Sequence, residues 1–292
     1  MNTNLSHAGY SMLMTVYVGT DAAELRESLV SMINQTISPA EYIVVADGPL
    51  TQPVEDELAS FFQTAGQEKC KLVRLPENHG AGFASGAGIP YCSYEYIARM
   101  DSDDISLPDR VAKQLDIMRS HQDYAAVGCW AREFITDEGA VSTVELPVEP
   151  DAVARYARRR CPVRHPCLLL RKSMLEQIGG YRDIRFAEEW DIINRFLQAG
   201  YRCYNIPEVL VKVRVGKDFY ARRGGMENAR RILGFKWQML KNRQTGLVDF
   251  LISESASAIV CFMPNALRGF VYGRLLRKRP SAGHFPNEDA GQ

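Results

Sequence analysis

The sequence lacks a net charge, because 35 lysine and arginine residues balance 35 aspartate and glutamate residues over 292 positions. Without a positive field the chain has no general means of attracting nucleic-acid phosphates, which argues against a DNA or RNA partner. Paired cysteines are lacking too, since the seven cysteines are scattered and form no CxxC motif: Cys70, Cys92, Cys129, Cys161, Cys167, Cys203 and Cys261. We therefore expect reduced, mostly buried thiols rather than a disulfide framework or a zinc site.

Long apolar runs are also absent. No stretch reaches the roughly 18 apolar residues of a membrane-spanning helix, and no basic region followed by an apolar core marks a signal peptide. A cytosolic or peripheral protein is therefore expected. What is present is an ordinary globular composition, 46% hydrophobic and 24% charged, which suits one large α/β domain with a small appendage.

Strand-like and helix-like segments alternate over the first hundred residues. Asp21, with Glu24 three residues later, predicts a helix start, and apolar residues follow at helical spacing from Leu25 to Ile33. Such βαβ alternation predicts a mostly parallel sheet with helices on both faces. The predicted strands are Tyr10–Val18, Tyr42–Ala46, Lys71–Leu75, Tyr94–Met100, Ala125–Trp130, Cys167–Leu170 and Val209–Val215, and 137–150 is expected to be looser.

Polar side chains follow these strands. In open α/β sheets ligands bind outside the carboxyl ends of the strands. Tyr17, Asp47, Asn78 and the acidic run that begins at Asp101 are therefore the residues expected to line a site.

Three carboxylates, Asp101, Asp103 and Asp104, stand within four residues at the end of an apolar strand. Burying acids this close together costs several kcal/mol unless a cation neutralises them. Mg²⁺ or Mn²⁺ takes one or two such carboxylates and completes its shell with phosphate oxygens and water. A helix start near Asp109 offers an alternative account of that residue and of Asp104, because acids favour helix N-termini.

With these residues in place, the chain resembles family 2 glycosyltransferases of the GT-A fold, in the bacterial exopolysaccharide branch that includes the amylovoran biosynthesis enzymes. The resemblance runs in order over about residues 10 to 240. Its matching stretches are 14–17, 31–36, Asp47-Gly48-Pro49, Asn78-His79-Gly80, 98–110, His165-Pro166, Gly179-Gly180-Tyr181, Glu188-Glu189-Trp190-Asp191, 205–208, Arg214-Val215-Gly216 and Arg222-Arg223-Gly224-Gly225.

The resemblance implies an α/β GT-A domain over residues 1–225, with nucleotide-sugar binding at about 10–110 and acceptor binding at about 111–225. It implies inverting transfer of a sugar from a nucleotide-sugar, with UDP as the default, to a hydroxyl of a lipid-linked or polysaccharide precursor in exopolysaccharide, capsule or O-antigen synthesis. Such an enzyme would work in the cytoplasm, free or at the cytoplasmic face of the inner membrane.

Site residues follow from the same resemblance. Asp103 and Asp101 would bind Mg²⁺ or Mn²⁺, and the donor would contact Tyr17, Asp47, Asn78, Arg99 and Asp101. Three of these donor residues have a structural alternative: Tyr17 as core, Asp47 as the first residue of an Asp-Gly turn, and Arg99 as a solvated neighbour of the acids.

Inverting transfer needs a base that deprotonates the acceptor hydroxyl. In relatives the base is usually the aspartate of a Glu-Asp pair at a helix N-terminus, and Glu189 stands at that position here. Asp191 is the second candidate, and the alternative for both is that acids favour the helix dipole.

His165 and Arg164 are predicted to contact the acceptor or a phosphate, with a histidine bonded inside a turn as the alternative. Arg158, Arg159 and Arg160 extend this basic run. A solvated helix end is the default interpretation, and contact with a lipid-linked diphosphate is the sharper one.

Residues 226–280 are predicted to form a helical tail in which apolar segments, among them 258–263, 267–271 and Leu275-Leu276, alternate with basic residues. This mixture suits either a helix at an anionic membrane surface or one docked on the domain or on a second copy. Residues 281–292 are predicted to be disordered.

Two other functions remain open at this stage. A sugar-nucleotide nucleotidyltransferase would also use carboxylate-held Mg²⁺, but the segment after the first strand, Tyr17 to Asp21, lacks a basic glycine-rich loop. A non-catalytic member that only binds a nucleotide-sugar is the other alternative, suggested by the departure at Glu189.

Overall fold

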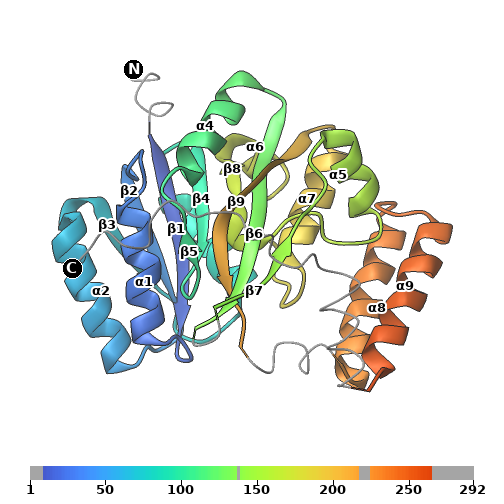
Figure 1. Ribbon diagram of the computed structural model, residues 1–292, viewed down its shortest axis with the longest axis horizontal. Helices are drawn as coiled ribbons and strands as arrows, with labels where there is room; N and C mark the ends of the chain where they lie inside the picture. Colours follow the sequence, from blue (N-terminus) through green and yellow to red (C-terminus); the bar gives the residue numbers. More distant parts are fainter. Residues whose placement is uncertain (1–8, 137–138, 217–223, 265–292) are drawn as a thin grey trace.

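The computed structural model describes residues 9–136, 139–216 and 224–264, and over these residues the chain forms one mixed sheet flanked by helices (Figure 1). The sheet order is β3-β2-β1-β4-β8-β6-β9-β5, with β7 paired to β6. The strands are β1 Tyr10–Tyr17, β2 Glu41–Asp47, β3 Cys70–Arg74, β4 Tyr96–Asp101, β5 Ile105–Ser106, β6 Tyr124–Ile135, β7 Gly139–Val144, β8 Leu169–Arg171 and β9 Arg202–Arg214. The predicted α/β fold is confirmed.

The N-terminal half of the sheet is parallel, so its strands end at one edge. In the register, Tyr17 at the end of β1 pairs with Asp47 at the end of β2, and Thr15 of β1 pairs with Asp101 at the end of β4. The predicted helix start is also confirmed, since Asp21 accepts hydrogen bonds from the amides of Ala23 and Glu24 (2.9 and 3.1 Å). This shared edge is where the site forms.

The second half of the sheet differs from the prediction in two places. The expected loose segment 137–150 contains β7, which pairs antiparallel with β6. The last strand begins at Arg202 rather than Val209, because a register shift opposite Trp130 accommodates Pro207 and Glu208, which interrupt its apolar pattern. A strand that carries a proline at a bulge is therefore longer than its apolar run suggests.

Helices cover both faces of the sheet. The face lined by Met12 and Met14 of β1 is covered by α1, α2 and α4, and the face lined by Leu13 is covered by α3, α5, α6 and α7. The helices are α1 Ala22–Ile33, α2 Gln52–Ala65, α3 Ala81–Gly88, α4 Arg110–Ser120, α5 Pro150–Ala157, α6 Lys172–Gln177, α7 Glu188–Gln198, α8 Met226–Lys241 and α9 Leu247–Phe262.

The last two described helices, α8 and α9, form a hairpin beside α5 and α7 (Figure 1). The Nε of Arg159 donates to Asp249 of α9 (2.6 Å), and the Phe235 ring of α8 lies 5.2 Å from that of Trp190. Docking on the domain, one of the two interpretations of the tail, is thus observed for residues 226–262. The segments 267–271 and 275–276 and the predicted disordered end lie outside the described residues. None of the helices that the structure describes is long and apolar enough to cross a membrane.

Glycine is required where α3 meets the sheet. A Cβ built on Gly88 would lie 2.5 Å from Leu13 Cδ1 and 2.8 Å from Val45 Cγ2, both in the buried core. We predict that Gly88→Ala lowers the free energy of unfolding by about 1–3 kcal/mol through overpacking. Gly234→Ala is the matched control: nothing lies within 4 Å of its Cβ position in α8. That change should raise stability by about 0.5–1 kcal/mol. Equal effects of the two substitutions in urea denaturation would contradict the packing argument.

Candidate active site

The acidic loop after β4 brings the three predicted aspartates together. One carboxylate oxygen from each of Asp101, Asp103 and Asp104 lies within 4.8 Å of the others. Asp103 is exposed, whereas Asp104 is buried and accepts a hydrogen bond from the amide of Arg214 (2.7 Å). Burial, and then the charge of Asp103, raise the pKa of Asp104 to about 8. The loop therefore concentrates negative charge where a cation would relieve it.

The predicted helix start at Asp109 is confirmed, because this residue occupies the N-cap position of α4. Asp109 precedes α4 but makes no side-chain capping bond, and its carboxylate instead accepts from the hydroxyl of Thr36 (2.6 Å). Asp104 is bonded to β9 rather than to a helix N-terminus. The helix start therefore accounts for the position of Asp109 but not for Asp104, which is held by β9.

Arg99 lies between the acidic loop and a second group of acids. Its side chain is only 1% exposed, so the alternative of a solvated arginine is wrong. The guanidinium contacts the carboxylate of Asp101, and its Nε has no hydrogen-bond partner among the described residues. Burial lowers the pKa of Arg99, while nearby Tyr181, Glu188, Asp104 and Glu189 act in the opposite direction. The guanidinium is therefore a fixed positive charge shared by both groups.

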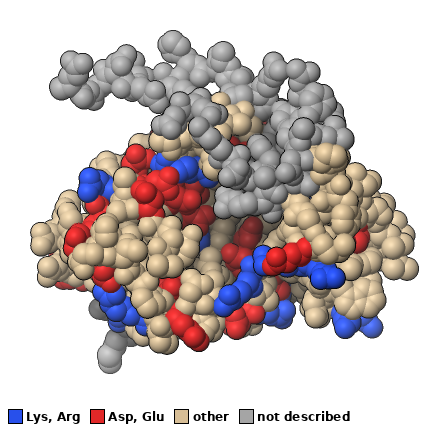
Figure 2. Space-filling view, turned by 90° about the horizontal axis from the view of Figure 1, so that it is seen from below, with Lys and Arg blue, Asp and Glu red and all other residues tan. Residues whose placement is uncertain are grey.

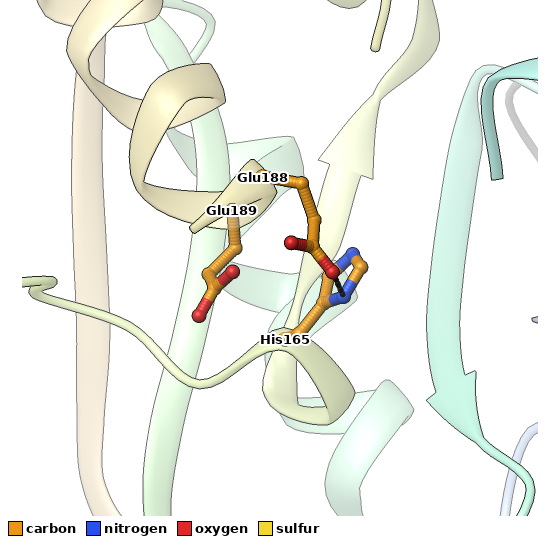
Figure 3. Close-up of side chains that lie close together, drawn as sticks. All are labelled: His165, Glu188 and Glu189. Carbon is orange, nitrogen blue, oxygen red and sulfur yellow. Dashed lines mark ion pairs between the residues drawn. The ribbon is translucent and has the colours of Figure 1, made fainter. Parts of the chain in front are cut away.

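The second group consists of His165, Glu188 and Glu189, whose side chains converge in Figure 3. His165 Nδ1 lies 3.7 Å from Glu188 Oε1, and Nε2 lies 2.9 Å from the hydroxyl of Tyr181. Burial, and then the charge of Arg99, hold the pKa of His165 well below its usual value. His165 begins a 3₁₀ turn over 165–167, which agrees with the alternative of a histidine bonded inside a turn. Its ring nevertheless lies beside the two glutamates.

Glu189 stands at the start of α7. Burial, and then the charge of Glu188, raise its pKa to about 7, against the opposing charges of Arg164 and Arg99. The residue before this pair, Ala187, has a φ of 59°, an uncommon conformation for a side chain other than glycine. Sulfur of Cys161 lies 3.8 Å from Glu189 Oε1. The carboxylate is thus held partly buried by a strained helix start.

Asp191, the second candidate for the base, lies in a different environment on the same helix. It is buried and accepts from Arg195 Nε (2.7 Å), with Arg182 Nη1 at 3.4 Å. Arg195 in turn donates to the carbonyl of Ile178 (2.7 Å). These contacts tie α7 to the segment after α6, and the structure does not group Asp191 with Glu188 and Glu189.

The predicted donor residues lie at the same edge of the sheet. Asp47 accepts from the amides of His79 and Gly80 (both 2.8 Å) and from Asn78 Nδ2 (3.0 Å), so it fixes the loop after β3. Gly48, with φ of 89°, forms the expected turn. Tyr17 is 47% exposed, so its alternative as a core residue is wrong. Figure 2 looks onto this edge and shows acidic and basic side chains gathered around a hollow.

Helices α3 and α7 meet closely beneath this edge. A Cβ on Gly82 would lie 3.0 Å from both Glu188 Cβ and the carbonyl oxygen of Ile184. Arg185 donates to the carbonyl of Asn78 (3.0 Å). The segment that carries the second acidic group is therefore joined directly to the loop after β3.

The arginines of the basic run before β8 contact two different parts of the fold. Arg164 donates to the fully buried carboxylate of Glu133 (2.7 Å). It also lies near Glu189, where its positive charge opposes the rise in the pKa of that carboxyl. Arg159 pairs with Asp249, and the carbonyl of Arg158 accepts from the hydroxyl of Thr245 (2.9 Å). Arg158, Arg159 and Arg160 are exposed directly after α5, as the solvated helix end predicts, and Arg159 in addition pairs with α9.

Sequence reasoning missed the role of Arg214 and Tyr181, although both stood in the matching stretches. Arg214 donates from its amide to Asp104, from Nε to the carbonyl of Asp103 (3.0 Å) and from Nη2 to Glu27 (2.5 Å). It thereby clamps the acidic loop against α1. No local pattern could have revealed this, because the partners are more than a hundred residues away. Arg222 and Arg223 lie outside the described residues.

The central charge of Arg99 can be tested by stability. Replacing it in Arg99→Met leaves the acids without their buried cation, so we predict a loss of about 3–5 kcal/mol at pH 8. The loss should shrink at pH 5, where the carboxylates can take up protons. The matched control is Arg26→Met, which removes an exposed partner of Glu57 and should change the free energy of unfolding little at either pH. A pH-independent loss in urea denaturation would contradict the electrostatic role.

Comparison with known proteins agrees with this geometry. The chain is 27% identical over 269 residues to the UDP-Gal:alpha-D-GlcNAc-diphosphoundecaprenol beta-1,3-galactosyltransferase of Escherichia coli, covering 92% of this chain and 97% of the relative. It is 29% identical over 263 residues to the amylovoran biosynthesis glycosyltransferase AmsE of Erwinia amylovora, covering 90% and 97%.

Among solved structures, the fold matches a mannosyltransferase from Pyrobaculum calidifontis in complex with GDP-Man and Mn²⁺. The TM-score is 0.62 at 18% identity, covering 88% of this chain and 71% of the other. This likeness shows the GT-A fold. Residues 11–179 match the glycosyl transferase family 2 profile, more than half of the chain. The chain therefore belongs to glycosyl transferase family 2 and is a glycosyltransferase of polysaccharide biosynthesis.

Proposed function

We propose that the protein is an inverting enzyme that transfers a sugar from a UDP-sugar to a hydroxyl of a lipid-linked diphosphate saccharide. The E. coli relative, whose name states a UDP-sugar donor and a diphosphoundecaprenol acceptor, supports both substrate classes. The observation that carries the proposal is the pairing of a partly buried carboxylate of raised pKa, Glu189, with an acidic loop across one buried arginine. The candidate base and the loop proposed to bind the leaving diphosphate thus lie on two sides of the same arginine.

Glu189 is the general base of this proposal. Its pKa of about 7 lets it be ionised at neutral pH yet basic enough to accept a proton. The acceptor hydroxyl gives its proton to the Glu189 carboxylate while its oxygen bonds to the anomeric carbon of the donor. The bond from that carbon to the diphosphate breaks on the opposite side, and a nucleoside diphosphate leaves. Asp191 serves as a positioning residue, because its carboxylate already accepts from Arg195.

Asp103 and Asp101 are the residues proposed to hold Mg²⁺ or Mn²⁺. They fit because three carboxylate oxygens converge there, and because burial and then the charge of Asp103 raise the pKa of Asp104. A divalent ion bound there would neutralise the diphosphate as negative charge builds on it. The unpartnered Nε of buried Arg99 adds a fixed cation on the same side. Tyr17, Asp47 and Asn78 are proposed to form the nucleoside side of the donor site.

The proton transfer predicts a specific phenotype for Glu189→Gln. Nucleoside diphosphate release should fall by at least 10³-fold, while donor affinity by calorimetry stays within about twofold. In the wild type, log(kcat/KM) should fall below pH 7 as Glu189 becomes protonated. Glu188→Gln removes a charge that raises this pKa, so it should move the acid limb to lower pH. Near-normal turnover of Glu189→Gln would transfer the role to Asp191 or elsewhere.

Stability provides an independent check on the same variant. The folded-state pKa of Glu189 is raised from 4.5 to about 7, so its contribution to stability is full below pH 4.5 and is lost by pH 7. Glu189→Gln should therefore be about 1–3 kcal/mol more stable than the wild type at pH 8 and gain nothing at pH 4. A variant that is inactive and less stable at pH 8 would indicate misfolding rather than loss of a base.

Metal dependence is tested at Asp103, whose side chain is exposed. Asp103→Ala should weaken donor binding in the presence of Mn²⁺ by at least tenfold and change binding little in EDTA. Asp109→Ala, an acid nearby whose carboxylate only accepts from Thr36, is the control and should retain the Mn²⁺ effect. Equal affinity of the Asp103 variant and the wild type, with and without Mn²⁺, would remove the metal from the proposal.

The two competing functions make different products. A nucleotidyltransferase would release pyrophosphate, and its basic glycine-rich loop after β1 is absent from the sequence between Tyr17 and Asp21. A non-catalytic member would release no nucleoside diphosphate from any donor. A screen of nucleotide-sugars scored by nucleoside diphosphate release, with chelator controls, separates all three.

A further inference from the structure

Helix α9 presents an uncharged surface to the outside. Six large apolar side chains on this helix are between 48% and 68% exposed, and the remaining exposed positions are small. The exposed residues are Leu247, Val248, Leu251, Ile252, Ser255, Ala256, Ile259 and Phe262. A surface helix normally turns charged residues toward water. Figure 2 agrees, because its right-hand side, where α8 and α9 lie, is mostly free of red and blue.

The charged residues of α9 instead face inward. Asp249 pairs with Arg159 of the domain (2.6 Å), and Glu254 lies 3.7 Å from Lys236 of α8. Lys236 is buried and donates to the carbonyl of Ser253 and the hydroxyl of Ser257 (both 2.6 Å). Helix α9 thus places its charged side chains toward the domain and its apolar side chains toward the outside, the opposite of a solvated surface helix. Pairing the charges of α9 on its inner side while leucine and isoleucine are exposed on the outer side is favourable where an apolar medium covers that outer side.

The exposed charges of the α8–α9 hairpin favour an anionic membrane as the apolar medium. Exposed cations on the hairpin outnumber its one exposed acid, Glu227: they are Arg230, Arg231, Lys241 and Arg243. Trp237, 48% exposed, lies with its ring 5.8 Å from Lys241 Nζ. The sequence from 264 to 287 adds five more basic residues and no acid. Apolar and aromatic groups bordered by cations match an anionic bilayer surface, whereas a symmetric contact with a second copy would place like charges together.

We propose that the outer face of α9, with Trp237 and the basic residues of the hairpin, binds the surface of an anionic membrane. With 16 residues α9 is about 24 Å long, shorter than the roughly 30 Å of bilayer hydrocarbon, and it carries two charged residues, Asp249 and Glu254, on its inner side. It therefore lies along the surface and does not cross it. Phe235 of α8 packs on Trp190, the residue after Glu189, so the hairpin holds the candidate active site next to the membrane.

This inference deepens the proposed lipid-linked acceptor and rests on that proposal for its purpose, but vesicle binding itself requires no glycosyl transfer. Full-length protein is mixed with vesicles of phosphatidylethanolamine and 30% phosphatidylglycerol, or of phosphatidylcholine alone, and sedimented. We expect the wild type to bind the anionic vesicles at least tenfold more strongly than the neutral ones. Leu251→Glu/Ile259→Glu, two changes on exposed positions, should lower binding at least tenfold. Val30→Glu, an equally exposed apolar residue on α1, should bind like the wild type.

Each other outcome overturns the proposal. Unchanged binding of the double variant would place the contact elsewhere in the chain. No binding by the wild type, together with a dimer in light scattering that the double variant converts to a monomer, would make the face a contact between copies. Donor hydrolysis in water is measured in parallel, and it should be the same in the double variant and the wild type. Glu189→Gln should lose donor hydrolysis but keep vesicle binding, so failure of the proposed reaction and failure of the membrane proposal can be told apart.

Discussion

The buried guanidinium of Arg99 is the constraint on which the site depends. Four carboxylates act on it from two segments far apart in the sequence: Asp101 and Asp104 from the loop after β4, and Glu188 and Glu189 from the start of α7. Without a cation between them these groups could not be held together in a partly buried space, because like charges that are desolvated repel strongly. Because Arg99 lies on β4, an inner strand of the sheet, its guanidinium holds both acidic groups in fixed positions relative to each other.

The sequence allowed much of this to be predicted, and the failures have identifiable causes. The parallel strands and the polar residues at their ends followed from apolar periodicity, since Tyr17, Asp47 and Asp101 end neighbouring strands. The burial of Arg99 did not follow, because an arginine beside three acids looks solvated until its neighbours from α7 are known. Likewise Glu189 and Asp191 are two residues apart on one helix, and only the packing of Arg195 distinguishes them.

The departure at Glu189 has a simple physical meaning. Glu189 is the proposed base, at a position where the resemblance leads us to expect aspartate. Its side chain has one more methylene, but a base is defined by its ionisation and reach rather than by its residue type. Burial and the adjacent Glu188 set the ionisation, and the left-handed Ala187 sets the direction in which the pair leaves the helix. Family membership therefore gives the class of reaction, while the surroundings of Glu189 supply the means by which this chain could carry it out.

The close approach of Gly82 to Glu188 has a consequence for engineering. At Gly82 the backbone of α3 leaves so little room that a side chain there would press on the Glu188 side chain, at the start of α7, and on the carbonyl oxygen of Ile184. Hybrid enzymes that combine a donor-side segment from one relative with an acceptor-side segment from another would need to keep this junction intact. A larger residue brought to position 82 by such an exchange would therefore displace Glu188 and with it the second acidic group.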